Sequence, residues 1–348
     1  MKKGLLHFLR CPSCHYSEFQ LFSELEKDSE VRKGEIRCTK CKASFMIEDG
    51  ILDLLFRPSI EVVRERQENI KALRKKRLSK NDAWLLGLPL ADNFGNEKYP
   101  IINRGYLANL QMIINAIGTL KSKHVLDLGA GTCWTTNILA EKEAICVATD
   151  ISREKYIGLS SADIFFKYRG TYFERVLSDM NRLPFKDHCF DIVFSNASVH
   201  HAQYLEGVFQ ESGRVLRDNG LLVLVNEPCG GVFKLSKRLD IAKAKERGMD
   251  VSEGWNEMIY SLFQYKSAAR RSGLRLKVFY PALYDLILRQ KTNLDSIRGI
   301  KHYLAMTCFY LYQIAALRKL SKSLFLPYLA LLGGVMVAVA QKTQDHAS

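Results

Sequence analysis

Short apolar segments alternate with amphipathic ones through most of the chain, and this alternation predicts an α/β fold. The apolar segments are rich in β-branched residues, which is typical of strands buried on both faces of a parallel sheet. Helical patterns at 99–117 and 134–141 lie between them. The expected strands of the main sheet are 124–128, 145–149, 190–196, 274–280 and 335–340.

A glycine turn follows the first of these strands. The strand 124–128 runs into Gly129-Ala130-Gly131-Thr132, and Asp150 closes the next strand. Glycines let backbone approach a ligand closely, and an acid about 20 residues after the first glycine is placed to hydrogen-bond a ribose. A dinucleotide site needs a third glycine where this chain has Trp134. The pattern therefore predicts a nucleoside site for a ligand without phosphates.

The segment Val125–Thr132 resembles the first motif of class I S-adenosylmethionine (SAM) methyltransferases. Three later segments resemble further motifs of that family in the same order, namely 178–180, 190–196 and 213–222. The resemblance implies a Rossmann-like, seven-stranded methyltransferase sheet. One departure is Cys133, where many relatives have glycine, and it is expected to reshape the pocket around the methionine tail.

The resemblance also implies a set of donor-binding residues. In the family the acid after the second strand, here Asp150, holds the ribose hydroxyls, and Asp127 lies by the methionine end. Asp179 is expected at the adenine amino group, with capping of a local turn as the alternative. The full expected set is Asp127, Gly129, Ala130, Gly131, Asp150, Ile151, Asp179, Met180, Ser195 and Asn196.

Three residues are candidates for acceptor chemistry. His200 and His201 follow the fourth strand, and Glu227 ends the fifth. The sulfonium of SAM is already electrophilic, so the protein must mainly align the acceptor and exclude water, but an oxygen acceptor would also lose a proton. Either histidine is a candidate base, with a structural contact as the alternative. Glu227 is a candidate to orient a hydroxyl or amine.

Two CxxC pairs near the start predict a second site. Cys11, Cys14, Cys38 and Cys41 have the spacing of a closed, tetrahedral, structural zinc site, and two pairs outside a βαβ unit argue against a redox motif. The segment 1–58 resembles the zinc ribbon of the activator subunit that partners tRNA and translation-factor methyltransferases. The resemblance implies a possible protein partner, while metal binding would supply much of the folding free energy.

Net charge and cysteine usage indicate the class of partner and the cellular compartment. The 348 residues carry a formal net charge of +14, which calls for an anionic partner: RNA, a membrane face or a glycan. Aromatic residues do not interleave with the basic clusters, so RNA is the second choice. The nine cysteines include five scattered ones outside the pairs, which indicates reduced thiols and a cytoplasmic location.

Substrate choice is expected in the last third of the chain. The expected organisation is a ribbon at 1–58, a basic helical linker at 59–98, a SAM-binding core at 99–281, a helical insertion at 282–333, and a final strand and tail at 334–348. The insertion is rich in tyrosine, phenylalanine and leucine, which suits an acceptor pocket, a membrane-facing surface or ordinary helix packing. Pro327 and Gly333-Gly334 interrupt its apolar end, so peripheral membrane contact is favoured over a membrane span.

Together these features predict a SAM-dependent methyltransferase with a structural zinc ion. The favoured acceptor is a small molecule, lipid or glycan, and the alternative acceptor is rRNA or tRNA. A different class of function is a catalytically inactive scaffold whose ribbon recruits a partner. The intact Asp127, Gly129, Gly131 and Asp150 favour an active enzyme.

Overall fold

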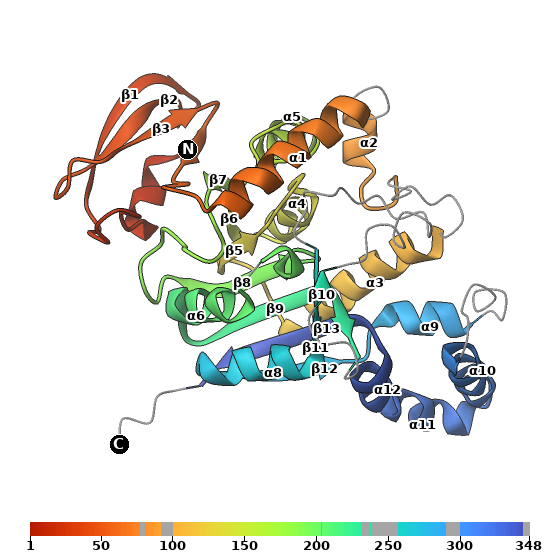
Figure 1. Ribbon diagram of the computed structural model, residues 1–348. Coiled ribbons are helices and arrows are strands. Elements are labelled where there is room, and N and C mark those ends of the chain that lie inside the picture. The colour runs from red at the N-terminus through yellow and green to blue at the C-terminus, as the bar shows by residue number, and fades with distance from the viewer. Residues whose placement is uncertain are drawn as a thin grey trace.

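One continuous sheet runs through the molecule, with helices on both of its faces (Figure 1). The computed structural model describes residues 1–76, 81–91, 100–202, 204–231, 237–238, 257–289 and 300–343. The strands are β1 (Phe19–Lys27), β2 (Glu30–Cys38), β3 (Ser44–Glu48), β4 (Ile51–Asp53), β5 (His124–Leu128), β6 (Ile145–Asp150), β7 (Glu174–Leu177), β8 (Phe190–Asn196), β9 (Leu216–Gly230), β10 (Lys237–Arg238), β11 (Met258–Ser261), β12 (Leu274–Phe279) and β13 (Gly333–Lys342).

Seven of these strands form the expected Rossmann-like methyltransferase sheet. Strands β7, β6, β5, β8 and β9 are parallel neighbours in that order, and β13 pairs antiparallel with both β9 and β12. The carboxyl ends of the parallel strands therefore meet at one edge, where ligands of open α/β sheets bind. The predicted fold class is confirmed.

Helices cover both faces because strand side chains alternate between two cores. In β5, Leu126 and Leu128 face the core beneath α6 and α8, whereas Val125 faces the core beneath α3, α4 and α5. The helices are α1 (Ile60–Lys76), α2 (Asp82–Leu86), α3 (Pro100–Ile117), α4 (Trp134–Glu141), α5 (Ala162–Arg169), α6 (Leu205–Val215), α8 (Leu262–Arg271), α9 (Ala282–Leu288), α10 (Ile300–Gln313), α11 (Arg318–Ser323) and α12 (Phe325–Leu332). Short 3₁₀ helices are η1 (Lys3–Phe8), η2 (Leu159–Ser161), η3 (Val199–His201) and η5 (Ala315–Leu317).

The ribbon is joined to the main sheet by strand pairing. Strands β1 to β4 are antiparallel, and β4 then pairs parallel with β7, with Leu52 opposite Val176. Buried ribbon residues and buried residues of the main sheet belong to the same hydrophobic core. The ribbon thus extends the sheet beyond its β7 edge.

The insertion between β12 and β13 is helical, as predicted, and consists of α9 to α12 with η5. Residues 290–299 of the insertion, the linker segments 77–80 and 92–99, and the tail from 344 lie outside the described residues. In the part of the chain that the structure describes, no helix combines the length and the apolar character that a membrane crossing requires.

Candidate functional site

The loop after β5 depends on its glycines. Gly129 and Gly131 have φ angles of +63° and +50°, in the left-handed region where a side chain is strained. A Cβ at Gly129 would also lie 2.6 Å from the Cβ of Ser198. The Ala130 N–H donates to the Thr149 carbonyl at 2.9 Å, which ties the loop to β6. The loop therefore presents bare backbone at the carboxyl edge of the sheet.

Asp150 ends β6 directly beside this loop. Its Oδ2 accepts the Gly131 N–H at 2.8 Å, and its Oδ1 accepts the Ser152 N–H at 2.8 Å. Burial raises the pKa of Asp150 to about 6, although these two backbone hydrogen bonds act in the opposite direction. A carboxylate has about four acceptor positions, so two remain for the hydroxyls of a ribose. Ile151 follows at the same edge and is half-buried.

Asp127 lies one strand away and is buried, with 1% of its surface exposed. The Thr136 hydroxyl donates to its Oδ2 at 2.6 Å. Burial raises the pKa of Asp127 to about 7, with a smaller contribution from the charge of Asp150. A buried carboxylate is costly without donors or a cation. This position fits a ligand that brings an ammonium group, as the methionine end of SAM does.

Ser195 and Asn196 end β8 and join a network of polar side chains. The Ser195 hydroxyl donates to Glu227 Oε1 at 3.1 Å. Asn196 Oδ1 accepts from Asn226 Nδ2 at 2.9 Å, and Asn226 Oδ1 in turn accepts from Asn109 Nδ2 at 2.8 Å. Asn109 of α3 was not predicted from the sequence. A buried asparagine among the apolar positions of an amphipathic helix was the signal available for it.

Glu227 is fully buried, and its oxygens accept hydrogen bonds from the chain itself. Oε1 accepts the backbone N–H groups of Ser198 at 2.9 Å and Val199 at 3.0 Å. Oε2 accepts the N–H of His200 at 3.2 Å and lies 3.0 Å from His200 Nδ1. These contacts make Glu227 a positioning residue for η3, and its role toward an acceptor stays a prediction.

The two predicted histidines lie side by side, with ring centroids 4.4 Å apart. Burial opposes a charge on His200, but hydrogen bonds and charges of Glu227 and Glu257 outweigh it and raise the pKa of His200 to about 10. Both ring nitrogens of His200 contact carboxylates, Nδ1 that of Glu227 and Nε2 that of Glu257, and a role for His200 as a base stays a prediction. His201 Nδ1 contacts Glu65 Oε1 at 3.0 Å.

Glu65 and Glu257 were not predicted as site residues. Glu65 comes from α1 and Glu257 precedes β11, and both reach the histidines after β8 through tertiary contacts. No local pattern around either residue marks such a contact.

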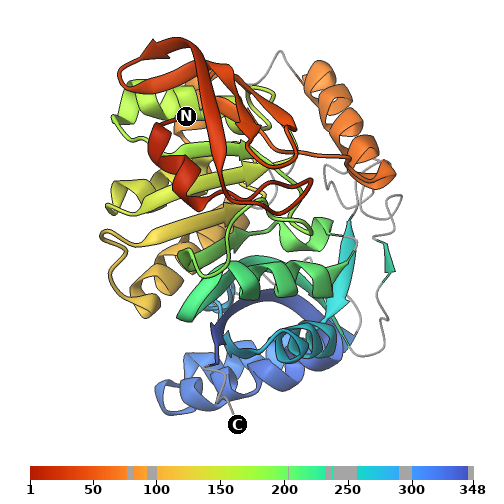
Figure 2. The ribbon, with the colours of Figure 1, turned by 90° about the vertical axis from the view of Figure 1, so that its left-hand side faces the viewer.

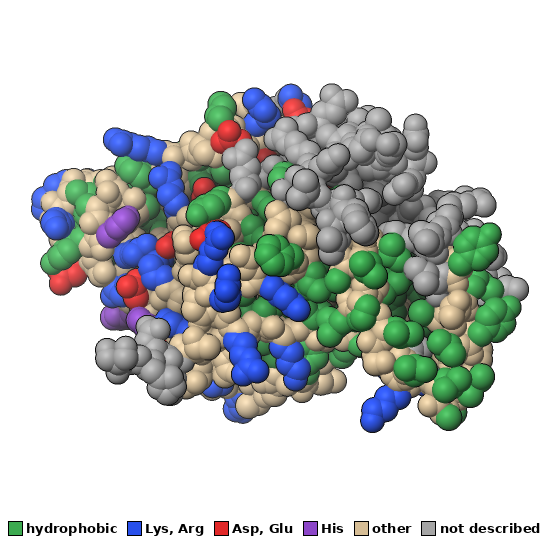
Figure 3. Space-filling view, turned by 60° about the horizontal axis from the view of Figure 1, so that its bottom comes forward, with side chains coloured by type: hydrophobic (Ala, Val, Ile, Leu, Met, Phe, Trp, Pro, Cys, Tyr) green, Lys and Arg blue, Asp and Glu red, His purple; other side chains and the backbone are tan. Residues whose placement is uncertain are grey.

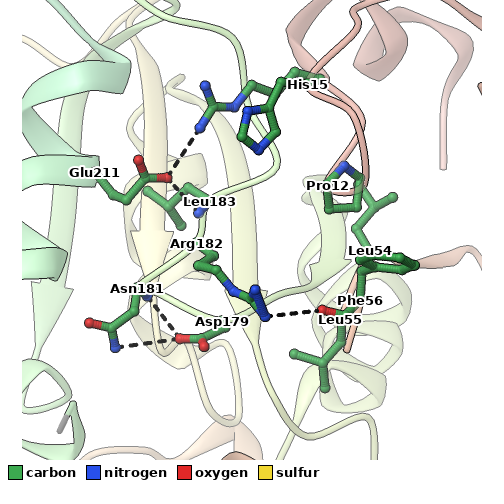
Figure 4. A pocket seen from close by; sticks show the side chains of 11 residues that line it. Pro12, His15, Leu54, Leu55, Phe56, Asp179, Asn181, Arg182, Leu183 and Glu211 are labelled. Atoms are coloured by element: carbon green, nitrogen blue, oxygen red, sulfur yellow. Dashed lines mark hydrogen bonds and ion pairs between the residues drawn. The ribbon is translucent and has the colours of Figure 1, made fainter. Parts of the chain in front are cut away.

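Asp179 and Met180 follow β7, and their side chains lie in different environments. Asp179 Oδ1 accepts the Asn181 N–H at 2.8 Å, which caps the local turn. Asp179 also lines a cavity of about 140 Å³ between the ribbon and the core, together with Arg182 and Glu211 (Figure 4). The Met180 methyl group would lie 3.5 Å from a Cβ at Gly129, so Met180 faces the donor loop. The adenine contact of Asp179 stays a prediction.

The four predicted metal ligands converge in the ribbon. The Sγ atoms of Cys11 and Cys41 are 3.6 Å apart, as are those of Cys14 and Cys38. Sulfur ligands at about 2.3 Å from a tetrahedral zinc ion lie about 3.8 Å from one another. Four thiolates at this spacing fit a closed structural zinc site.

The comparisons with family models and curated proteins agree with this geometry. Residues 126–224 match the model of a methyltransferase domain, and residues 2–50 match that of a Trm112p-like protein. A demethylmenaquinone methyltransferase of Mycolicibacterium gilvum (strain PYR-GCK) is 33% identical over 122 residues, which cover 34% of this chain and 50% of that protein. The protein of the same name from Mycobacterium sp. (strain KMS) is 36% identical over 109 residues, covering 31% and 44%.

The chain spans about half the length of the curated relatives it matches. Among solved structures, geranyl diphosphate C-methyltransferase of Streptomyces coelicolor A3(2) superposes with a TM-score of 0.50 at 11% identity, covering 82% of this chain and 99% of that one. This likeness concerns the fold. The chain thus carries a Trm112p-like domain over residues 2–50 and a methyltransferase domain over residues 126–224, and both resemblances drawn from its sequence are confirmed.

Proposed function

We propose that this protein is a SAM-dependent methyltransferase whose acceptor is a small lipid-soluble molecule. The proposal that the protein binds SAM rests on one observation. Asp150 accepts the Gly131 N–H at 2.8 Å, which fixes a carboxylate against a glycine loop at the carboxyl edge of a parallel sheet. This arrangement suits a nucleoside whose ribose is held by the acid and whose tail follows the loop.

Separate residues of the chain would bind the ribose and the methionine end of SAM, and the acceptor must then be aligned with the methyl group. Bound SAM supplies a methyl group on a positively charged sulfur. Asp150 would hold its ribose hydroxyls, and Asp127 would bind the ammonium of its methionine end. The backbone at Gly129 and Gly131 lets the ligand approach without a side chain in between. Alignment of the acceptor with the methyl group is then the main remaining task.

Helix α1 covers this edge of the sheet and helps to exclude water. Asn69 Nδ2 donates to Ser152 Oγ at 3.1 Å, beside Asp150, and Glu65 contacts His201 after β8. Figure 2 shows α1 lying across the ends of the strands. Water exclusion strengthens the electrostatic contacts to the donor and protects the methyl group from hydrolysis.

The lipid-soluble acceptor is favoured by the surface of the insertion. Figure 3 shows hydrophobic side chains crowded at the end of the molecule that α10 to α12 form. The exposed apolar side chains there are Tyr303, Tyr310, Ile314, Leu320, Leu324, Leu326 and Leu331. Exposed basic residues of α11, among them Lys319, stand beside them. Apolar and basic groups that are exposed on the same helical segment suit the surface of an anionic membrane.

The insertion is also tied to the candidate site. The Leu283 N–H of α9 donates to Asn109 Oδ1 at 2.9 Å, and Asn109 donates to Asn226. The curated relatives are named demethylmenaquinone methyltransferases, and that name supports an acceptor of lipid character for this chain. RNA is the second candidate because the net charge is +14.

The acceptor is tested by offering radiolabelled SAM with separated cell fractions. We expect label in the organic lipid extract with wild-type protein and none with Asp150→Ala. Label only in RNA would move the acceptor to nucleic acid. Donor binding without label in lipid, RNA, glycan or small-molecule fractions would favour the scaffold function.

A further inference from the structure

We propose that His200, His201 and Glu257 bind a divalent transition-metal ion beside the donor loop, in addition to the zinc ion of the ribbon. One ligand atom from each residue can be chosen so that all lie within 4.8 Å of one another. None of the three lies in the ribbon, and they come from two places about 55 residues apart in the chain, η3 and the residue just before β11.

The nitrogen and oxygen atoms are arranged around a common point. His200 Nε2 lies 3.3 Å from Glu257 Oε2, and His201 Nε2 lies 3.8 Å from Glu257 Oε1. Ligands about 2.1 Å from a metal ion are about 3.0 to 3.4 Å apart in octahedral or tetrahedral geometry. Small side-chain rotations would therefore bring the three groups to bonding distance of one ion.

Each histidine is also oriented by a carboxylate on its other nitrogen. Glu227 Oε2 lies 3.0 Å from His200 Nδ1, and Glu65 Oε1 lies 3.0 Å from His201 Nδ1. Histidines that bind metals almost always donate their other N–H to such a partner, which fixes the ring and the tautomer. The same arrangement on both rings leaves both Nε2 atoms directed at Glu257.

The backbone that carries the three groups is held independently of any ion. The backbone N–H groups of η3 are bound by Glu227, as described above. Strand β11 pairs with β9 through Tyr260 and Cys229, and the Tyr260 hydroxyl donates to the Ala202 carbonyl at 2.6 Å. These contacts join β11 directly to η3, so the ligand positions are preorganised.

The ligand set defines the class of ion. Imidazole nitrogens suit Zn²⁺, Fe²⁺ and Co²⁺ better than Mg²⁺ or Ca²⁺, which prefer oxygen ligands. Three protein ligands leave open positions for water or another oxygen. The Ser198 side chain beside η3 packs against Gly129, which puts the ion near the donor loop. A role in holding an acceptor oxygen rests on the proposed function, whereas binding of the ion does not.

The test uses the full chain with zinc already bound in the ribbon, titrated with Co²⁺. We expect one Co²⁺ per chain, with weak visible absorption and no sulfur-to-cobalt charge-transfer band. His201→Ala and Glu257→Gln should weaken this binding. Glu65→Gln, which changes only the orienting carboxylate, should weaken it about 10-fold or more. The control His188→Ala removes a histidine that is 57% exposed and should bind as the wild type does.

Wild-type protein that takes up no Co²⁺ at millimolar concentration would overturn the proposal. A charge-transfer band that accounts for all bound Co²⁺ would do so too, because it would mean exchange into the ribbon. Loss of binding in His188→Ala, or unchanged binding in Glu257→Gln, would assign the ion to other groups. SAM affinity and melting temperature report whether each variant is folded, and the wild-type stoichiometry decides the question even if one is not.

Discussion

Two carboxylates at the ends of neighbouring strands define the candidate donor site. Asp127 is buried and Asp150 is half-buried, and within the described residues no lysine or arginine forms an ion pair with either. A carboxylate in such a place has a raised pKa because its charged form loses hydration. The molecule keeps two acids in costly positions, which is expected where a ligand supplies the missing donors and charge.

The affinity for SAM should therefore depend on pH. The pKa of Asp127 is about 7 and that of Asp150 about 6 in the unliganded protein, both above the ordinary value. The folded chain favours the protonated form of both acids. The free energy of unfolding is therefore highest, as far as these two groups are concerned, below their ordinary pKa of about 3.9, and it falls as pH rises through 6 to 7. Binding favours the ionised forms, so affinity should rise between pH 5.5 and 8 with release of protons.

Calorimetry in two buffers of different ionisation enthalpy measures this proton release. Asp127→Asn should reduce the number of protons released. A SAM affinity and a proton count that do not change between pH 5.5 and 8 would contradict the roles given to both acids.

Gly129 offers a second test at the scale of one residue. Gly129→Ala should abolish SAM binding, because the new Cβ would lie 2.6 Å from the Ser198 Cβ at a φ of +63°. The strain of a left-handed alanine alone costs about 1 kcal/mol or more. Gly170→Ala is the matched control, since Gly170 has a φ of +66° and nothing within 4 Å of the added Cβ. SAM binding by Gly129→Ala equal to that of the control would refute the close approach.

Residues near in sequence to the glycine turn could be predicted, whereas their tertiary partners could not. Gly129, Gly131 and Asp150 belong to one βαβ unit, and their spacing determines that they meet. Glu65 and Glu257 meet the histidines only because α1 and β11 pack against η3. Such contacts depend on how elements that are distant in the chain pack in the fold, and a local sequence pattern does not predict this packing.

At the scale of elements, the pairing of β4 with β7 makes the ribbon part of the main sheet. Arg175 of β7 is 1% exposed and reaches across this junction. Its guanidinium donates to Glu30 of β2 at 2.9 Å, to the Asp49 carbonyl at 2.9 Å and to Asp163 of α5 at 2.9 Å. The junction thus combines a backbone ladder with a buried ionic cluster.

Arg175→Met should lower the free energy of unfolding by about 1 to 3 kcal/mol, because it removes three buried hydrogen bonds while Glu30 keeps the N-terminal ammonium and Arg32 as partners. Arg37→Met is the control, since Arg37 pairs with Glu35 on the exposed face of the ribbon. Urea unfolding monitored by circular dichroism gives both values. Equal losses in the two variants would show that the buried cluster adds nothing beyond a surface pair.

Removal of zinc should unfold the ribbon and expose the edge of β7. The Leu54 N–H donates to the Leu177 carbonyl at 3.0 Å, so amide protection on both sides depends on the ribbon staying folded. Hydrogen exchange with and without a strong chelator measures this. We expect fast exchange in β2, β3 and β4 and unchanged protection in β5. Protection that persists in the ribbon after the metal has gone would contradict a structural role for zinc.

The second ribbon hairpin could be predicted and the first could not. The turn residues Asp49-Gly50 separate two apolar-rich segments within residues 43–54, a pattern that predicts the two strands observed as β3 and β4. Strand β1 has side chains that are largely exposed on both faces, so no alternation of apolar and polar residues distinguishes it from a polar loop. The partner of β4 is a strand more than 100 residues away in the chain, which no local signal specifies.

At the scale of the whole molecule, the ribbon and the helical insertion stand at opposite ends of the sheet, with the candidate site at the edge between them (Figure 1). The seven-stranded core could be predicted because its motifs occur in a recognisable order. The extension of that sheet by the ribbon could not be predicted, since it depends on the pairing of the three-residue strand β4 with the edge strand β7.

The apolar face of the insertion should bind membranes. We expect the protein to sediment with anionic phospholipid vesicles and to be only partly released by salt, because burial of apolar groups is not screened. Tyr310→Glu with Leu326→Glu should reduce binding, whereas Leu25→Glu, a change at a 56% exposed position of the ribbon, should not. Complete release by salt, or equal binding by both variants, would contradict a membrane-facing insertion.

Binding of SAM by the glycine loop and Asp150 can be measured by calorimetric titration of the zinc-loaded protein with SAM. We expect one site per chain in the wild type, no measurable binding in Asp150→Ala, and unchanged binding in Asp187→Ala, whose 59% exposed side chain pairs with Arg214 away from the loop. A folded wild-type protein without affinity for SAM, or an Asp150→Ala variant that binds SAM as tightly as the wild type does, would show that these residues do not form a SAM site.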